Sequence, residues 1–559
     1  MPSLPALPGP LAGFTHRASL ILELDLTSPP ASPEPGDRLA GLLLRGRPLL
    51  SPTLRALHEA GEDPRVGGLI VKVGGRLPWA MAHELRQGVR RFVSSGKPTL
   101  AWAESFADGA DMAAYMLAAA CGEVWLQPGG GLGLLGVGIE TTFVRGLLDR
   151  LGVEPQLEQR YEFKNAADRI MRTGYTDEHR LALDRLAESI FDTALEAIAA
   201  DRSVGADELR RLIDGGPRTA PEARDAGLVD RLGYRDEAYA AIRSQAGADA
   251  ELLFADRWRP RRRPPTLPGR RRGHVALVEV RGGIASGRSR RSPMGRQTGS
   301  DSIAMALRSA ARDEQAKAVV LRVDSPGGSA VASEVIWREV CLLGDAGKPV
   351  IVSMGEAAAS GGYYIACPAD VIVAQPATLT GSIGVFGGKF VTRELRERIG
   401  LTSDSVQHGD RSLMFSSRRR FSDAELERLA AMIDGIYDDF VAKVASGRRR
   451  PAAEIEGLAR GRVWTGADAL DVGLVDELGG LRDAVRIARE RGGLPKRAPV
   501  RHPGHVPAIE RLGRPRNSED PRAQLTTRLP RLGGITSDLA ADLGLPMEIA
   551  LRMPEISLR

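Results

Sequence analysis

A serine flanked by small residues is the clearest candidate for a nucleophile in this chain. Ser360 stands in the run Ala357–Tyr363 (AAASGGY), directly before a pair of glycines. Small neighbours leave room for a substrate, and the N–H of Gly361 follows the hydroxyl immediately in the sequence. A hydroxyl in such a setting suits acyl transfer, in which an activated serine attacks a carbonyl carbon.

Two glycine-containing segments on either side of Ser360 support this interpretation. Upstream, the turn Asp324–Ser329 (DSPGGS) follows the apolar run VVLRV, which is typical of a strand. The backbone N–H groups of such a turn can approach a ligand without interference from Cβ atoms and can stabilise a developing oxyanion. Downstream lies Thr380–Gly384 (TGSIG). Together the three segments predict a nucleophile with an oxyanion hole.

The chain contains two copies of one pattern, and the serine occurs only in the second copy. Tyr115 in the first copy corresponds to Tyr363 in the second, whereas Met112 stands where the second copy has Ser360. The Pro-Gly-Gly turn is also missing from the first copy. The matching segments, first copy before second, are 67–73 and 317–323, 111–138 and 356–388, and 222–233 and 467–479.

A serine nucleophile needs a base, and the sequence offers two kinds. The eight histidines show no paired placement with Ser360, although distance in the sequence leaves a Ser-His-Asp triad open. Only eight lysines stand among the 77 Lys and Arg residues, and lysine, unlike arginine, can lose its proton when desolvated. Lys164 has Ser412 as its approximate counterpart in the second copy, although its local sequence also fits a solvated surface lysine.

At these motifs the chain resembles the signal peptide peptidase A family (protease IV) in its long, duplicated form, within the Clp protease/crotonase superfamily. The resemblance covers roughly residues 17–490, with DSPGGS, ASGGY and LTGSIG as its most specific pieces. It implies Ser360 as the nucleophile, Lys164 as the general base and Ser382 as the hydroxyl that orients the lysine. It also implies an oxyanion hole made by N–H groups near Gly327, Gly328 and Gly361.

Strands that alternate with helices must position these residues. Continuous apolar runs predict buried parallel strands, and amphipathic patterns near 177–201 and 423–446 predict long helices. We therefore expect an α/β protein with two tandem Clp protease/crotonase-like repeats, each with a largely parallel sheet and flanking helices. The predicted parts are an N-terminal tail (1–16), a first repeat that supplies the lysine (17–250), a Pro/Arg-rich linker (251–272), a second repeat that supplies the serine (273–490) and a C-terminal tail (491–559).

Composition argues against several other classes of protein. The net charge is +6, but the basic runs lie in Pro/Gly/Ser-rich connections without interleaved aromatic residues, and aromatics make up only 5% of the chain. This pattern indicates no nucleic-acid partner and leaves peripheral contact with anionic lipid possible. The three cysteines lack metal-ligand spacing, so we expect neither a metal nor another cofactor.

The sequence also carries an expectation about location. No stretch approaches the roughly 20 apolar residues that a membrane span requires, and the first residues lack the pattern of a signal peptide. The long forms of the family in Gram-negative bacteria have an N-terminal membrane anchor, which this sequence lacks. We therefore expect a protein that is cytoplasmic or peripheral to the membrane.

The resulting prediction is a serine endopeptidase with a Ser-Lys dyad that cleaves apolar peptides such as remnant signal peptides. The resemblance further implies a homo-oligomer, specifically a homotetramer. Two alternatives stay open at this point. One is an acyl-CoA hydratase or isomerase of the crotonase type, and the other is a duplicated scaffold that binds peptides without cleaving them.

Overall fold

The computed structural model describes residues 20–31, 48–107, 111–260, 273–292, 295–402, 404–408, 410–503, 550–552 and 557–558. Three predicted parts lie wholly or partly outside the described residues. They are the N-terminal tail, residues 261–272 of the linker and most of the C-terminal tail. The chain divides into two compact units. Unit 1 comprises Met1–Pro78, Glu84–Gly136 and Ala194–Pro265, and unit 2 comprises Trp79–His83, Val137–Thr193 and Thr266–Arg559.

Unit 1 is built on a six-stranded sheet in which every described pairing is parallel. Its order is β10 (Glu251–Phe254), β1 (Leu20–Leu26), β2 (Val66–Val73), β3 (Thr99–Ala103), β4 (Glu123–Leu126) and β9 (Arg231–Leu232). The central strands are apolar and buried on both faces, as expected of a parallel sheet with helices on each side.

The main sheet of unit 2 repeats this order with additions at its edges. Parallel pairing links β11 (His274–Arg281), β15 (Ala316–Ser325), β17 (Val350–Ala359), β18 (Val371–Ala374) and β22 (Glu477–Leu478) in the way that β1, β2, β3, β4 and β9 are linked in unit 1. At the other edge β23 (Val500–Arg501) pairs parallel with β11, as β10 pairs with β1. The added strands are β19 (Leu379–Gly381) and β21 (Val463–Thr465). The predicted α/β fold with an internal repeat is confirmed.

Unit 2 also contains a second, seven-stranded sheet. Its order is β13 (Arg290–Ser292), β14 (Gly295–Gly299), β12 (Gly283–Ala285), β16 (Gly327–Ser329), β24 (Ala550–Arg552), β20 (Phe386–Val391) and β7 (Glu154–Gln159). This sheet brings together segments that are far apart in the sequence, including both glycines of the Pro-Gly-Gly turn.

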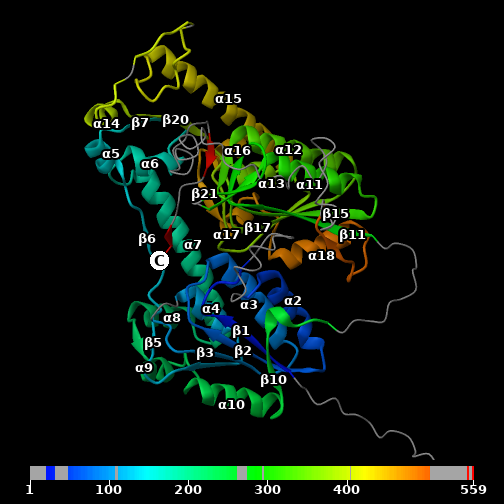
Figure 1. Ribbon diagram of the computed structural model, residues 1–559. Helices are drawn as coiled ribbons and strands as arrows, with labels where there is room; N and C mark the ends of the chain where they lie inside the picture. Colours follow the sequence, from blue (N-terminus) through cyan, green and yellow to red (C-terminus); the bar gives the residue numbers. More distant parts are fainter. Residues whose placement is uncertain are drawn as a thin grey trace, which may run out of the picture. The chain divides into compact units, whose positions relative to one another are not determined.

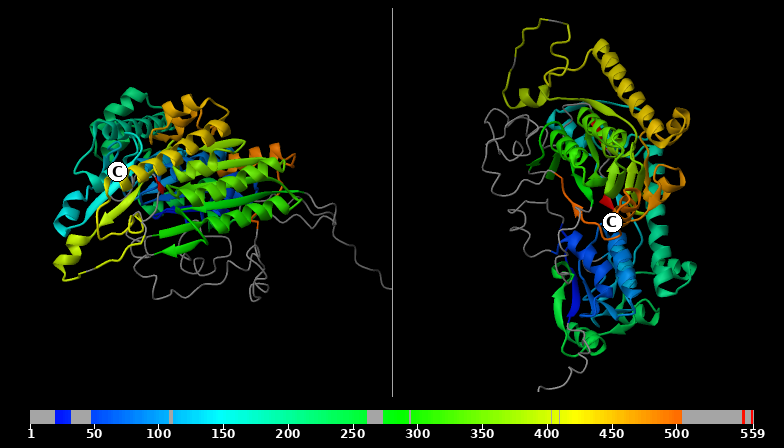
Figure 2. Two further views of the ribbon diagram at one scale, coloured as in Figure 1. Left: turned by 90° about the horizontal axis from the view of Figure 1, so that it is seen from above. Right: turned by 90° about the vertical axis from the view of Figure 1, so that its right-hand side faces the viewer.

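Some of the helices cover the faces of the main sheet in each unit, as Figures 1 and 2 show, and others lie beyond the sheet faces. In chain order they are α2 (Leu50–Glu59), α3 (Trp79–Val93), α4 (Met112–Ala119), α5 (Arg145–Leu151), α6 (Asp168–Met171), α7 (Asp177–Arg202), α8 (Ala206–Asp214), α9 (Ala220–Asp225), α10 (Arg235–Ala246), α11 (Ser300–Arg312), α12 (Ala330–Asp345), α13 (Gly361–Ala366), α14 (Arg393–Arg398), α15 (Asp423–Arg448), α16 (Ala452–Leu458), α17 (Gly466–Asp471) and α18 (Leu481–Arg491). Among the described residues, no helix has the length and apolar character needed to cross a membrane.

The segment that carries Lys164 packs with the second repeat. The sequence places residues 17–250 in one repeat, but the compact units assign 137–193 to unit 2. The reason is the antiparallel pairing of β7 with β20, in which Gln159 lies opposite Phe386 and Glu154 opposite Val391. The candidate lysine and the candidate serine therefore belong to the same compact unit.

A buried tyrosine forms the same brace in both repeats. The hydroxyl of Tyr115 donates to the carbonyl of Leu228 at 2.6 Å, and the hydroxyl of Tyr363 donates to that of Leu474 at 2.8 Å. Both tyrosines are fully buried, and burial raises the pKa of each phenol above its ordinary value. The correspondence that the sequence predicts for these tyrosines extends to their hydrogen bonds.

We predict that Tyr115→Phe destabilises unit 1 by about 1 kcal/mol, because the buried carbonyl of Leu228 then loses its donor. Urea unfolding should show a lower midpoint with an unchanged slope. An unchanged midpoint would mean that the brace contributes nothing to stability.

Candidate active site

Ser360 occupies the sharp turn between β17 and α13. Its backbone has φ 54° and ψ −115°, a conformation that costs a residue with a side chain about 1–3 kcal/mol. The N–H of Ser360 donates to the carbonyl of Gly381 at 2.7 Å, and its carbonyl accepts from Tyr364 N–H at 2.8 Å. The serine is fully buried. A strained strand-to-helix turn held on both sides is typical of a nucleophile that must present its hydroxyl in one position.

The pairing of β7 with β20 delivers Lys164 to this turn. After β7 the chain stays against β20, because Arg160 donates its N–H to the carbonyl of Val385 at 3.0 Å. Tyr161 then reverses the backbone with φ 63°. Lys164 follows three residues later, and its side chain is fully buried.

The Lys164 amine contacts two serines. Its Nζ lies 2.8 Å from Ser360 Oγ, 2.9 Å from the carbonyl oxygen of Ser382 and 3.0 Å from Ser382 Oγ. Ser382 is itself held in a left-handed conformation with φ 50°, and its N–H donates to the carbonyl of Arg462 at 2.7 Å. The structure thus brings together the three side chains that the sequence singled out.

Two glycines make room for the lysine. A Cβ on Gly461 would lie 2.4 Å from Lys164 N and 2.5 Å from Lys164 Cα. A Cβ on Gly384 would lie 3.0 Å from Lys164 Cδ. Gly461 also has φ 85°, so a residue with a side chain is disfavoured there on two grounds. The absence of Cβ atoms at 384 and 461 lets the backbone and stem of Lys164 come close to the second repeat.

Burial lowers the pKa of the Lys164 amine well below the ordinary value of lysine. Desolvation disfavours the ammonium, and the described hydrogen-bond partners of the amine are hydroxyl and carbonyl oxygens, which carry no negative charge to offset this effect. A neutral amine can accept a proton, which is the property that a general base needs.

A second buried lysine shows that burial alone does not mark the site. The side chain of Lys389 in β20 is also nearly inaccessible, and burial together with nearby Arg419 lowers its pKa to about 8. Its Nζ donates to the carbonyl of Met414 at 2.6 Å and lies over the ring of Phe421. Lys164 is distinguished by the serine hydroxyls around it.

The candidate oxyanion donors gather beside Ser360. A Cβ on Gly361 would lie 3.1 Å from Gly328 N and 3.2 Å from Gly327 Cα, so these backbones are in close contact. The N–H of Gly327 donates to Ser325 Oγ at 3.1 Å. Because the N–H of Gly327 is used in that bond, the N–H groups of Gly328 and Gly361 are the better candidates for binding an oxyanion.

Sequence reasoning missed Gly461 and Ser325. Ser325 is fully buried, and its hydroxyl orients the Gly327 peptide through the bond described above. The sequence signal for Ser325 was present, because it lies inside the DSPGGS motif. Gly461 lies in an arginine-rich stretch, and only the close approach of Lys164 shows why a glycine stands there.

Two of the described histidines lie beside aspartates rather than beside the serine. His179 Nδ1 lies 3.3 Å from Asp168 Oδ2, and His274 Nε2 lies 3.5 Å from Asp313 Oδ2. Within the described part of the chain, no histidine hydrogen-bonds to the Ser360 hydroxyl. The Ser-His-Asp alternative therefore gains no support there.

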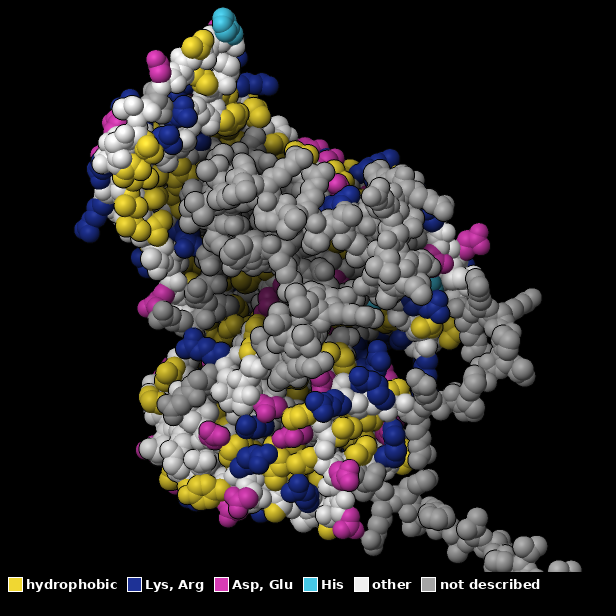
Figure 3. Space-filling model, in the orientation of Figure 1, with side chains coloured by type: hydrophobic (Ala, Val, Ile, Leu, Met, Phe, Trp, Pro, Cys, Tyr) yellow, Lys and Arg dark blue, Asp and Glu magenta, His cyan; other side chains and the backbone are white. Residues whose placement is uncertain are grey.

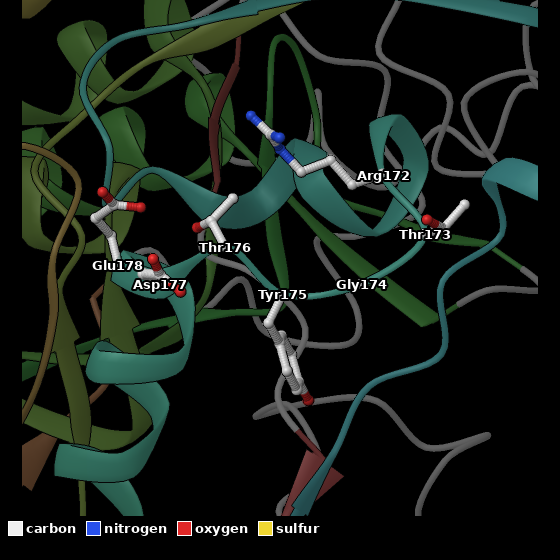
Figure 4. Close-up of a pocket in the computed structure, with 7 residues that line it drawn as sticks. All are labelled: Arg172, Thr173, Gly174, Tyr175, Thr176, Asp177 and Glu178. Carbon is white, nitrogen blue, oxygen red and sulfur yellow. The ribbon is translucent and has the colours of Figure 1, made fainter.

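Other surface features lie outside this constellation. A hollow is lined by residues Arg172–Glu178, which form the connection after α6 and the first residues of α7. Figure 4 shows Arg172 and Tyr175 pointing in different directions. On the face in Figure 3, basic and acidic side chains are interspersed over the described surface of unit 1. Among the described residues, no cluster of three or more His, Cys, Asp or Glu side chains could hold a metal ion.

A buried Ser-Lys pair on a duplicated α/β scaffold is the arrangement of a serine hydrolase, and comparison with known proteins defines the family. The model of peptidase family S49 matches residues 91–249 and 343–494, more than half of the chain. The chain belongs to peptidase family S49. This assignment confirms the predicted resemblance to the signal peptide peptidase A family.

Two relatives extend over most of the chain. Protease 4 of Salmonella typhi is 33% identical over 452 residues, which cover 78% of this chain and 71% of the relative. The chloroplastic serine protease SPPA of Arabidopsis thaliana is 29% identical over 453 residues, covering 78% of this chain and 65% of the relative. The chain thus spans slightly less than two thirds of the plant relative.

A solved structure with a partial likeness is the N165D mutant of ClpP1 from Listeria monocytogenes. It is 15% identical, covers 37% of this chain and 94% of its own, and has a TM-score of 0.24.

The close approach of Lys164 to Gly461 can be tested by adding a Cβ at position 461. Gly461→Ala should lower kcat/KM for a fluorogenic peptide by at least about a hundredfold, because the new Cβ displaces Lys164 from Ser360. Gly493→Ala is the matched control, since Gly493 also has positive φ (61°) but its Cβ would meet nothing within 4 Å. Equal activities for the two variants would contradict the steric explanation.

Proposed function

We propose that this chain is a serine endopeptidase with a Ser-Lys dyad that cleaves apolar peptides such as remnant signal peptides. The observation that carries the proposal is the 2.8 Å contact between Lys164 Nζ and Ser360 Oγ in a fully buried position. Membership of a peptidase family and the serine protease named among the relatives agree with it.

The hydrogen-bonding capacity of a neutral amine fits the contacts of Lys164. Such an amine has two N–H donors and one lone pair. The carbonyl oxygen and hydroxyl of Ser382 accept the two N–H groups, which leaves the lone pair for the O–H of Ser360. In this arrangement Ser382 orients the base and Ser360 is ready to give up its proton.

The reaction follows from this geometry. Lys164 takes the Ser360 proton while Oγ forms a bond to the carbonyl carbon of the substrate, and the resulting oxyanion accepts the N–H groups of Gly328 and Gly361. Lys164 then passes the proton to the departing amine nitrogen as the C–N bond breaks. Lys164 next takes a proton from a water molecule, whose oxygen forms a bond to the acyl carbon. As the bond from that carbon to Oγ breaks, Lys164 returns the proton to Oγ, which releases the acid product and restores Ser360.

The two alternatives find less support in the site. No carboxylate is among the described hydrogen-bond partners of Ser360 or Lys164, whereas crotonase-type hydration generally relies on carboxylates. A scaffold that only binds peptides has no need for a buried amine beside a strained serine.

The proposed protein forms a homo-oligomer, specifically a tetramer, and contacts membranes peripherally. Apolar surface for such contacts is provided by four exposed side chains, Leu147, Leu151, Ile399 and Leu401.

Substitution of either dyad member tests the assignment. We expect Ser360→Ala and Lys164→Met each to lower peptide hydrolysis by at least about a thousandfold while the fold is retained, as checked by circular dichroism. Lys348→Met is a matched control, because Lys348 is also desolvated but donates to the carbonyls of Ala310 and Asp313. Full activity in Lys164→Met would remove lysine from the mechanism.

The pH dependence gives an independent test. Because only the neutral amine accepts a proton, kcat/KM should rise with pH through the lowered pKa of Lys164 and then reach a plateau. Reaction of Ser360 with a fluorophosphonate should show the same inflection. Activity that falls as pH rises through this range would exclude a neutral lysine base.

A nearby carboxyl needs a control in this experiment. Burial and the neighbouring Asp324 raise the pKa of Glu356 to about 7, and its carboxylate accepts the N–H groups of Ala80 and Met81 at 3.1 and 2.6 Å. Glu356→Gln retains an acceptor oxygen without titrating. An inflection that persists in this variant belongs to Lys164, whereas one that disappears belongs to Glu356.

A further inference from the structure

A short segment of the second repeat, residues 460–462, runs beside the turn that leads to Lys164. It lies between α16 and β21 (Figure 1), and it belongs to unit 2, as Lys164 does. The carbonyl of Arg460 accepts the N–H of Phe163 at 3.2 Å. The guanidinium of Arg462 lies over the ring of Phe163, 5.1 Å from its centroid. Backbone and side chains of this segment thus contact the lysine segment directly.

The same segment also contacts the part of the chain that surrounds the nucleophile. The N–H of Gly461 donates to the carbonyl of Ile383 at 2.8 Å, and the N–H of Ser382 donates to the carbonyl of Arg462 at 2.7 Å. The strand that follows, β21, pairs antiparallel with β19, which directly precedes Ser382. Residues 460–462 therefore join the lysine side of the candidate dyad to its serine side.

The side chain of Arg460 makes two contacts with the lysine segment. Its Nε and Nη2 donate to the two carboxylate oxygens of Glu162 at 2.8 and 2.9 Å, and its guanidinium lies over the ring of Tyr161, 4.3 Å from the centroid. A bidentate pair of this kind fixes direction as well as distance. The hydrogen bonds from Arg460 lower the pKa of the Glu162 carboxyl, so the pair is charged at neutral pH.

The two turns that meet at this ion pair both have unfavourable backbone conformations. Tyr161 has φ 63° and Arg460 has φ 52°, values that residues with a side chain seldom adopt. Such conformations persist where surrounding contacts hold them. The hydroxyl of Tyr437 accepts the N–H of Arg460 at 3.2 Å, and its ring lies 4.8 Å from that of Tyr161. These contacts hold the two turns in one position relative to each other.

We propose that Arg460 is a positioning residue, which clamps the turn before Lys164 through Glu162 so that the amine reaches the nucleophile. The inference rests on the proposed function, in which Lys164 is the general base. Its amine lies 2.8 Å from Ser360 Oγ, and a small displacement from such a distance lowers the rate steeply. A looser turn would also let water reach the amine and return its pKa toward the ordinary value of lysine.

Kinetics of the two members of the ion pair test the Arg460 clamp. We expect Glu162→Gln and Arg460→Gln each to lower kcat about tenfold or more and to leave KM within about twofold, because the change affects the base. The double variant should lose no more than about twofold beyond the slower single variant, since both substitutions remove one contact. Unchanged kcat in both single variants would overturn the proposal, and so would losses that multiply in the double variant.

An ion pair of similar exposure supplies the matched control. Arg185 of α7 donates to the carboxylate of Asp468 in α17 at 3.1 and 2.6 Å, and its side chain is 44% exposed, against 38% for Arg460. This pair also joins the extension 137–193 to the second repeat, but it does not involve the turn before Lys164. Arg185→Gln should leave kcat within about twofold of the original. An equal loss of kcat in this variant would mean that any such attachment matters, and would overturn the Arg460 clamp.

The pH profile distinguishes a positioning role from a loss of stability. In Arg460→Gln the inflection of kcat/KM should move to higher pH, because water that reaches the amine favours the ammonium. In Arg185→Gln the inflection should stay where it is. An inflection that does not move in Arg460→Gln would contradict the proposal.

Lys164→Met separates this inference from the proposed function. If that variant is inactive while Arg460→Gln keeps the original kcat, the dyad stands and the Arg460 clamp is refuted. If Lys164→Met is fully active, the dyad itself is refuted, and Arg460 has no base to position.

Discussion

The burial of one amine is the constraint on which the rest of this active site depends. An ammonium in an apolar interior is strongly disfavoured, so Lys164 is pushed toward its neutral form. The site offers it hydroxyl and carbonyl oxygens rather than a carboxylate, which would favour the charged form. In the proposed dyad, a neutral amine beside a serine hydroxyl can accept the hydroxyl proton directly.

Reaching that buried position requires features from several parts of the chain. The β7–β20 pairing carries the lysine segment to the second repeat. Glycines at 384 and 461 then allow the backbone and stem of Lys164 to approach closely. The positive-φ conformations of Ser360 and Ser382 place their hydroxyls around the amine. The positive φ angles of the serines and the close contacts at the two glycines are strained or sterically demanding, which is common at functional sites.

The duplication explains how such a site could be divided between two copies. Both repeats keep the scaffold, as the matching tyrosine braces and strand orders show. The first copy has Met112 in place of the serine and lacks the Pro-Gly-Gly turn, but its extension over 137–193 lies within unit 2. In the proposed mechanism the first copy contributes through Lys164 rather than through a second centre. In the seven-stranded sheet, β24 from the C-terminal part of the chain lies between β16 and β20.

Much of this protein could be predicted from its sequence, because the evidence was local or repeated. Apolar runs alternating with amphipathic segments determine the α/β class, and small residues around Ser360 and the DSPGGS turn indicate a nucleophile and its donors. The tertiary structure decided what depends on contacts between distant residues. The unit to which 137–193 belongs follows from strand pairing, and the burial of Lys164 follows from glycines hundreds of positions away. Two further features depend on distances in space that no sequence pattern specifies. The N–H of Gly327 donates to Ser325, and β24 pairs beside Gly328.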